Sequence, residues 1–236
     1  MIFAPVLLVS LRSMPNLKST SDPAPVDDTV LSQLRDALGD RPVWIASSTH
    51  PGEEQIVLAA HRQLLADHPD LCLLLVPRHP QRGDEVAQLI TDQGLTHARR
   101  SAGQLPGDAD QVYLADTLGE TGTWYALSPL VFLGGSLMPI GGHNPFEPAL
   151  ARAAVLTGPH TTNFVETFPP LIAAGGAVEV ADAPGLAAGI GLWLDQPDQL
   201  QATRDAAFGF VQAQQSALDA VIETLCTRLA LEPQDA

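Results

Sequence analysis

The densest group of residues that could do chemistry lies between positions 133 and 148. Two glycine pairs are followed there by a histidine, an asparagine and a glutamate, in the run Leu133-Gly134-Gly135-Ser136-Leu137-Met138-Pro139-Ile140-Gly141-Gly142-His143-Asn144-Pro145-Phe146-Glu147-Pro148. Glycine pairs let the backbone approach a ligand closely, and Asn144-Pro145 is a natural helix start, with Asn as N-cap and Pro in the first turn. Free N–H groups at such a turn can hold a phosphate, and Glu147 could bind both hydroxyls of a ribose. Turn chemistry alone does not ask for His, Asn and Glu together, so this run predicts a nucleotide site.

Two earlier segments could supply donors to the same ligand. Ser48 and His50 lie in a short polar run before an acidic pair, and their hydroxyl and imidazole groups suit phosphate or sugar oxygens. Taken alone, that run is explained better by Thr49 or Ser48 capping a helix. Arg78 and His79 end an apolar run, where a guanidinium could bind a phosphate through two hydrogen bonds.

A fourth polar segment, Asp116-Thr117-Leu118-Gly119-Glu120, offers a competing use for that arginine. Arg78 could pair with a carboxylate such as Asp116 or Glu120, and the local sequence does not decide between this pairing and a phosphate. A capping box, in which Thr117 and Glu120 bond each other's backbone N–H groups, accounts for Glu120. The role of Asp116 stays open.

Other site classes fit the sequence poorly. Neither G-x-G-x-x-G after the first strand nor G-x-x-x-x-G-K-[ST] occurs, and there is no G-x-S-x-G elbow. Histidines at positions 50, 79, 143 and 160 lack H-x-x-x-H spacing and a cysteine partner, which argues against a metal site. The formal net charge of -15 argues against nucleic acid and anionic membranes as partners, although a small anion needs only a few local donors.

Alternating strand and helix patterns must position these segments. Apolar runs of strand length are expected at 42–47, 71–76, 112–115, 130–133, 154–157 and 177–180, and helical patterns at 28–38, 53–68, 84–93, 120–127 and 198–231. Asp27 or Asp28 can cap the first of these helices. Regular alternation predicts an α/β fold with a Rossmann-like, doubly wound parallel sheet. Ligands bind such sheets at the carboxyl ends of the strands, where the polar segments fall.

The chain is expected to contain a leader with an interdomain linker remnant over 1–27 and one nucleotide-binding domain over 28–236. The connector is rich in Ser, Thr, Asp and Pro. Met1 to Leu11 is apolar but about half the length of a membrane-spanning helix, so direct membrane insertion is not expected. Two distant cysteines, in a chain without a signal peptide pattern, predict free thiols in a cytoplasmic protein.

The order and spacing of these motifs resemble the C-terminal half of bacterial Kdo (3-deoxy-D-manno-octulosonic acid) transferases over roughly residues 15 to 180. The matching elements are Asn16-Leu17-Lys18, Ser48-x-His50-x-Gly52-Glu53-Glu54, Pro77-Arg78-His79-Pro80, Asp116-Thr117-x-Gly119-Glu120, Gly134-Gly135-Ser136, Gly141-Gly142-His143-Asn144-Pro145-x-Glu147-Pro148 and Gly158-Pro159-His160-x-x-Asn163-Phe164. The first element departs from the family pattern, because Pro15 stands where the family has glycine.

This resemblance implies a GT-B glycosyltransferase, in which the C-terminal domain binds the donor CMP-Kdo and needs neither a metal nor another cofactor. It implies that Arg78 contacts the phosphate or the cytidine edge, that the turn from Gly141 through Gly142 and His143 to Asn144 holds the phosphate, and that Glu147 holds the ribose. The rest of the donor pocket would be lined by Ser48, His50, His79, Asp116, Gly135 and Ser136.

The resemblance also implies partners beyond this domain. The acceptor would be a lipid A precursor in lipopolysaccharide biosynthesis, at the cytoplasmic face of the inner membrane. It would bind through the family's N-terminal domain, which also carries the acidic general base. We therefore expect no catalytic residue in this chain and no sugar transfer by it alone. Two alternatives remain: a UDP-sugar epimerase or hydrolase with a similar fold, and a non-catalytic nucleotide-binding module.

Overall fold

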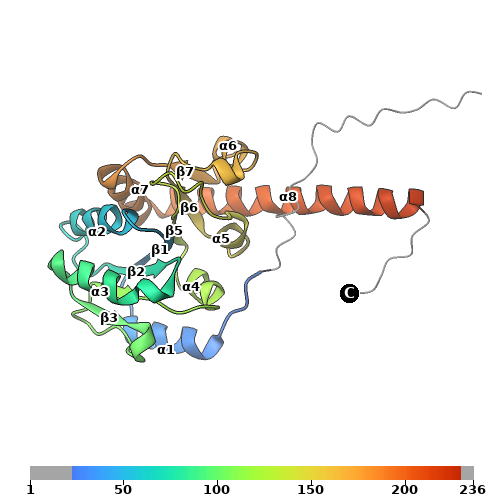
Figure 1. Ribbon diagram of the computed structural model, residues 1–236. Coiled ribbons are helices and arrows are strands. Elements are labelled where there is room, and N and C mark those ends of the chain that lie inside the picture. Colours follow the sequence, from blue (N-terminus) through green and yellow to red (C-terminus); the bar gives the residue numbers. More distant parts are fainter. Residues whose placement is uncertain (1–22, 230–236) are drawn as a thin grey trace, which may run out of the picture.

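The computed structural model describes residues 23–229 (Figure 1). Seven parallel strands form one sheet in the order β3-β4-β2-β1-β5-β6-β7. Along the chain, β1 is followed by β2 beside it and by β3 at one edge of the sheet, β4 is then inserted between β2 and β3, and β5 pairs with the other side of β1. The strands are β1 (Val43–Thr49), β2 (Cys72–Pro77), β3 (His97–Arg99), β4 (Val112–Leu114), β5 (Leu130–Leu133), β6 (Ala154–Thr157) and β7 (Ala177–Glu179).

Helices cover both faces of this sheet, because alternate strand residues point to opposite faces and both sets are apolar. One core joins α2, α3 and α7 to residues such as Trp44 and Leu73. On the other face, α1 and α4 pack against Ile45 and Leu74, while α5, α6 and α8 pack around Val155. The result is the three-layer, doubly wound α/β architecture that the alternation predicted.

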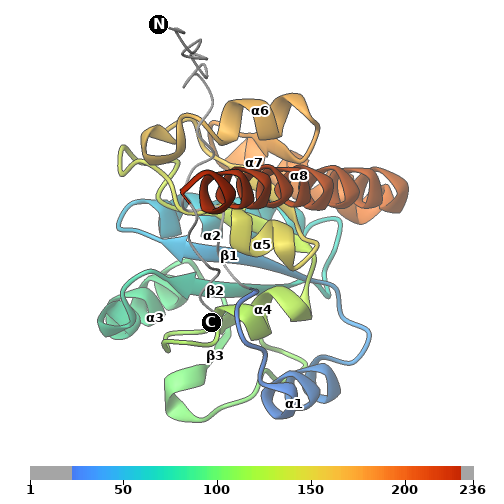
Figure 2. The ribbon, with the colours of Figure 1, turned by 90° about the vertical axis from the view of Figure 1, so that its right-hand side faces the viewer.

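The helices are short except for the last. They are α1 (Asp28–Leu38), α2 (Glu53–Leu64), η2 (Pro80–Arg82), α3 (Gly83–Asp92), η3 (Arg100–Ala102), α4 (Thr121–Leu127), α5 (Phe146–Leu150), η4 (Thr162–Phe164), α6 (Phe168–Ala173), α7 (Ala183–Asp195) and α8 (Pro197–Leu229). The first part of α8 packs beside α5 and β6, and its far end projects beyond the domain (Figures 1 and 2). Among the described residues, no helix combines the length and apolarity needed to cross a membrane.

The predicted elements agree well with the structure. All six predicted strands and the five predicted helices are present, with ends shifted by a few residues, and the expected C-terminal helix is one continuous element. The prediction omitted β3, α6 and α7. The leader and most of the linker lie outside the described residues, but Asp27 bonds the N–H groups of Thr29 and Val30 and caps α1 as expected.

Candidate functional site

The loops that follow β1 and β5 meet where the strand order reverses direction, which is where open α/β sheets bind ligands. The two strands pair in register up to Ser47 opposite Leu133, and the Gly134 N–H then donates to the Ser47 carbonyl at 2.8 Å. After Ser47 the pairing register with β2 shifts, and Ser48 adopts a φ of 57°. Such a conformation is strained for a residue other than glycine, and strain of this kind concentrates at functional sites.

Two predicted site histidines, His50 and His143, come into direct contact from these loops. Their Nε2 atoms lie 2.8 Å apart, and their rings stack 11° from parallel. Since a hydrogen bond between two imidazole nitrogens needs one donor and one acceptor, the pair holds one proton between the facing atoms. The ring of His79, at the end of β2, meets His50 edge-on with a centroid distance of 5.6 Å.

The surroundings keep this histidine pair uncharged near neutral pH. Burial, together with smaller contributions from the nearby His50, Arg78 and His79, lowers the pKa of His143 to about 4. Burial also lowers the pKa of His50, an effect that the Glu53 carboxylate opposes and that His79, Arg78 and Arg82 reinforce. A bound anion would have the opposite effect on both rings, because a nearby negative charge favours the protonated form.

The loops themselves are held by Glu53, the first residue of α2. Its fully buried carboxylate accepts N–H bonds from His50 in one loop and from Gly135, Ser136 and Leu137 in the other. We predicted that Thr49 or Ser48 caps this helix, and that prediction is wrong. Gly52 occupies the N-cap position without a side-chain cap, and the Thr49 hydroxyl is buried with no partner in the described chain.

The glycine and serine residues after β5 have separate structural roles. Gly135 has a φ of 68°, and a Cβ there would lie 2.8 Å from the His143 ring, so only glycine leaves room for that imidazole. The buried Ser136 hydroxyl donates to the Leu133 carbonyl and accepts from the Gly158 N–H. Ser136 therefore links two loops rather than presenting a free hydroxyl.

The second glycine pair forms the turn that carries His143. Gly141 and Gly142 have φ values of 110° and 79°, and a Cβ on Gly141 would collide with the Asn163 side chain. The Gly142 N–H donates to the Gly135 carbonyl at 2.7 Å. This bond folds the turn back onto the first glycine pair, so His143 is fixed from both sides.

Arg78 is exposed and, within residues 23–229, its guanidinium has no hydrogen bond or ion pair. Its charge lowers the pKa values of His50 and His143 and opposes a rise at Glu147, so it lies close enough to influence all three groups. The alternative pairing of Arg78 with Asp116 or Glu120 is not present. An unpaired cation beside two neutral imidazoles is suited to an anionic ligand.

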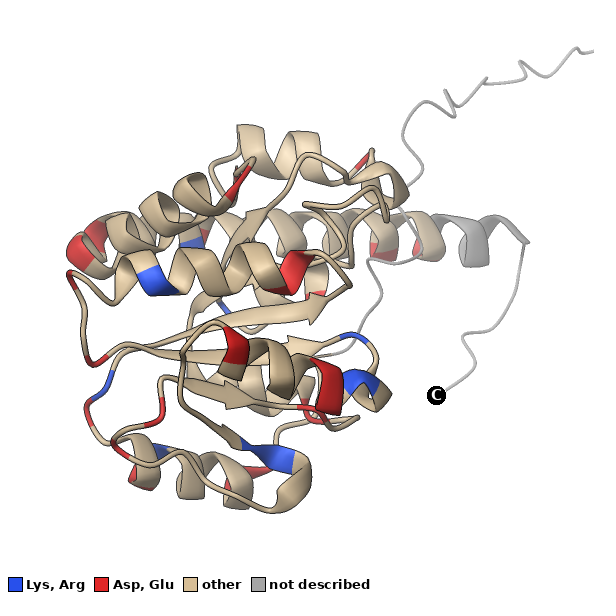
Figure 3. Ribbon diagram, turned by 60° about the vertical axis from the view of Figure 1, so that its left-hand side comes forward, with Lys and Arg blue, Asp and Glu red and all other residues tan. Residues whose placement is uncertain are grey.

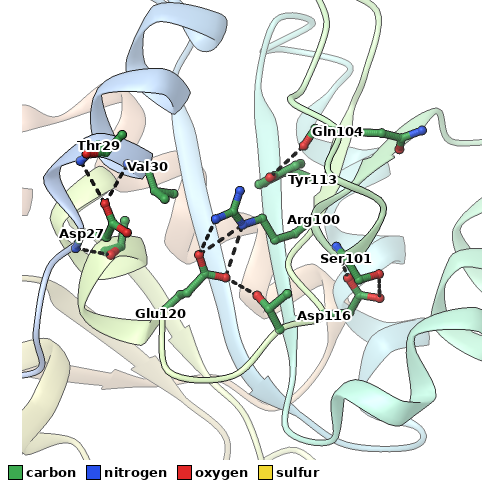
Figure 4. Close-up of polar contacts among 11 residues, drawn as sticks. Asp27, Thr29, Val30, Arg100, Ser101, Gln104, Tyr113, Asp116 and Glu120 are labelled. Atoms are coloured by element: carbon green, nitrogen blue, oxygen red, sulfur yellow. Dashed lines mark hydrogen bonds and ion pairs between the residues drawn. The ribbon is translucent and has the colours of Figure 1, made fainter.

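Asp116 and Glu120 are bound to arginines other than Arg78, and Figure 4 shows the pairing of Glu120 with Arg100. Asp116 is almost fully buried and accepts from Arg99 Nε at 2.6 Å and from the N–H and hydroxyl of Ser101. Glu120 accepts from Arg100 at 2.6 Å and from the Thr117 hydroxyl. The predicted capping box is therefore wrong, because long-range arginine contacts engage the Glu120 side chain. The structure does not show Asp116 facing the histidine pair.

Glu147 lies on α5 beside a hollow of about 290 Å³ that is also lined by Gly119, Thr121 and Gly122. Burial raises the pKa of its carboxyl, while a hydrogen bond with Asn144 and the charge of Arg78 oppose the rise. Asn144 also accepts from the Phe146 N–H, although Pro145 rather than the predicted Asn144 occupies the N-cap position, and the helix begins at Phe146. Glu147 thus borders this hollow and lies close enough to Arg78 to be influenced by its charge, whereas Arg78, His50 and His143 do not line the hollow.

The protein as a whole has 27 acidic residues against 12 basic ones. Acidic residues are spread over the helices and loops in Figure 3, in keeping with the net charge of -15. No group of three or more His, Cys, Asp or Glu side chains in the described part of the chain could hold a metal ion. The chemistry available here is recognition of an anion by Arg78, imidazoles and backbone N–H groups, with a carboxylate nearby for hydroxyls.

Comparison with known proteins defines first a class and then a family. No protein-family model matches the chain. Its fold is that of GT-B C-terminal domains, shared with UDP-GlcNAc 2-epimerase from Neisseria meningitidis at 16% identity and a TM-score of 0.56. The C-terminal CMP-Kdo binding domain of WaaA from Acinetobacter baumannii is 35% identical, with a TM-score of 0.74, and the match covers 78% of this chain and 97% of that domain. The chain belongs to the 3-deoxy-D-manno-octulosonic acid transferase family and corresponds to its C-terminal domain.

Curated relatives carry the same family name. The transferase of Haemophilus influenzae is 41% identical over 187 residues, which are 79% of this chain and 44% of that protein. The transferase of Bordetella pertussis is 38% identical over 189 residues, which are 78% of this chain and 44% of that protein. The chain therefore spans less than half the length of these relatives.

Proposed function

We propose that this domain binds CMP-Kdo, the sugar nucleotide from which the family transfers its sugar. The observation that carries the proposal is the unpaired Arg78 guanidinium beside the neutral His50–His143 pair. In the bound state Arg78 would contact the phosphate, supported by the turn from Gly141 to Asn144. Glu147 would accept hydrogen bonds from the ribose hydroxyls at the edge of its hollow.

A calorimetric titration tests the binding step, with CMP as the ligand and UMP, UDP and ADP as comparisons. Arg78→Ala should weaken CMP binding by roughly 10- to 150-fold, because a hydrogen bond to a charged group contributes about 1.5–3 kcal/mol. Arg62→Ala is the matched control, since Arg62 is also exposed but lies on α2 near Gln93, and its loss changes the net charge equally. Equal effects of the two substitutions, or tighter binding of UDP than of CMP, would contradict the proposal.

The ribose contact has its own test. The wild-type domain is expected to bind CMP more tightly than 2′-deoxy-CMP, because the deoxy ligand leaves a half-buried carboxylate without one of its donors. Glu147→Ala should bind the two ligands with equal affinity. If the variant still discriminates between them, another group reads the ribose.

We further propose that sugar transfer needs the part of the family's longer chains that this chain does not match. That part would bind the lipid A precursor at the cytoplasmic face of the inner membrane and supply the general base. Incubation of this chain alone with CMP-Kdo and a lipid A precursor should then give no transfer above the uncatalysed rate. Transfer by this chain alone would show that it contains a complete active site.

A further inference from the structure

Glu53 is a buried charged residue that has no role in the proposed function. Its carboxylate is wholly inaccessible, and it accepts four backbone N–H bonds at 2.6 to 3.0 Å. One oxygen, Oε2, accepts from both His50 and Gly135, so a single atom joins the loop after β1 to the loop after β5. These are the two loops that carry the histidine pair.

We propose that Glu53 is a positioning residue for donor binding, one that sets the distance between the His50 and His143 loops and so shapes the anion site. This inference takes its ligand, CMP-Kdo, from the proposed function. The contacts of Glu53 with the two loops are present without any ligand. Glu53 acts on His50 through the N–H of that residue and on His143 through Gly135, whose Cα faces the His143 ring.

A carboxylate is needed because four donors converge on this point. Two ionised oxygens offer about four acceptor sites, whereas an amide offers one oxygen and would turn an NH₂ group toward backbone N–H groups. Buried donors without a partner are costly, so an amide here should let one loop move away from the other. Glu53 already accepts the N–H groups of Gly135, Ser136 and Leu137, so these donors are not available to a ligand. A ligand anion would therefore bind to Arg78 and to the turn from Gly141 to Asn144.

The next residue provides a matched control. Glu54 lies in the same helical turn and is also fully buried, but its carboxylate binds Arg82 Nη1 at 2.7 Å and bonds neither histidine loop. Glu53→Gln and Glu54→Gln thus remove one buried charge each, the first bonded to both histidine loops and the second bonded to neither. Both variants should lose stability, and only Glu53→Gln should change the titration of His143, since the Arg82 partner of Glu54 acts on His50 and not on His143.

The experiment combines imidazole NMR titrations of the ligand-free proteins with CMP calorimetry. In Glu53→Gln the loops should separate, the His143 ring should gain solvent, and its pKa should rise from about 4 toward 6.5. The Kd for CMP should increase at least about tenfold, against a change within about threefold for Glu54→Gln. If Glu53 acted only through its charge, the pKa of His50 would fall instead, because that charge now raises it.

Unchanged imidazole titrations together with unchanged CMP affinity in Glu53→Gln would overturn the proposal. Should that variant not fold, Glu53→Asp keeps the charge on a side chain one methylene shorter, and it should bind CMP with a Kd between those of the wild type and Arg78→Ala. Wild-type affinity in Glu53→Asp would overturn the proposal equally. If the wild type binds no CMP, the donor assignment fails, and the NMR titrations still decide whether Glu53 sets the loop geometry.

Discussion

His61 makes this domain's stability depend on pH in a way that can be worked out from its contacts. It is fully buried on α2, and Trp44 Nε1–H donates to its Nδ1 atom at 3.1 Å. Nδ1 must therefore be unprotonated, and Nε2 carries the hydrogen that bonds the Gln111 carbonyl at 2.9 Å. A second proton would have to enter at Nδ1, against the Trp44 N–H and in a fully buried site.

Burial accordingly lowers the pKa of His61 to about 4 from its ordinary 6.5. Between these values the unfolded chain binds a proton that the folded protein excludes, so this contribution to stability is complete above pH 6.5 and is lost as the pH falls toward 4. A pH of 5 lies about 1.5 units below the pKa of 6.5 at which His61 of the unfolded chain takes up its proton. At about 1.4 kcal/mol per unit, the free energy of unfolding should therefore fall by about 2 kcal/mol.

Urea unfolding at pH 7 and pH 5, followed by tryptophan fluorescence, measures this loss. Other groups also titrate in this range, so the comparison is made with His61→Gln, which can keep both hydrogen bonds but cannot take up a proton. The wild type should lose about 2 kcal/mol more than the variant between the two pH values. Equal losses in the two proteins would refute the reasoning, since they would mean that His61 titrates alike in the folded and unfolded states.

Three further substitutions test local features of the site and of its support. Ser48→Gly should raise the free energy of unfolding, measured in urea, by about 1 kcal/mol, because it removes strain at φ 57°. The same substitution should weaken CMP binding, measured by calorimetry, if the Ser48 hydroxyl contacts the ligand. Asp27→Ala should lower stability by about 1 kcal/mol through loss of the α1 cap and leave CMP affinity unchanged in the same assays. Gly135→Ala should weaken CMP binding, because its Cβ would meet the His143 ring, and NMR should show that ring displaced.

The features that the sequence predicted correctly depend on residues close to one another in the chain. The Asp27 cap spans two or three residues, and the helix start that Asn144-Pro145 predicts lies at the next residue, Phe146. The strands were recognisable because runs buried on both faces are continuously apolar. His50 and His143 were both selected as site residues, because polar loops after parallel strands share one edge of the sheet.

The features that it did not predict depend on contacts between distant segments. Glu53 meets partners 82 to 84 residues away, and nothing in its own neighbourhood indicates them. The caps predicted for α2 and α4 failed for the same reason, since the Glu53 and Glu120 side chains already bond other segments. The α7 helix contains three glycines, which disfavour a helix, but Gly189 lies against Leu156 of β6, where a larger residue would be crowded.

The arginines near the rim show why a strongly acidic chain can still bind an anion. Arg82 is paired with Glu54, Arg99 with Asp116 and Arg100 with Glu120, and in each pair the carboxylate is fully or largely buried. These pairs remove from Arg78 the acidic partners that local sequence offered it. Among the described arginines of this rim, the acidic residues thus pair with Arg82, Arg99 and Arg100 and leave the Arg78 guanidinium without a carboxylate partner. A negative net charge argues against an extended polyanion, whereas a small anion needs only local donors such as this guanidinium.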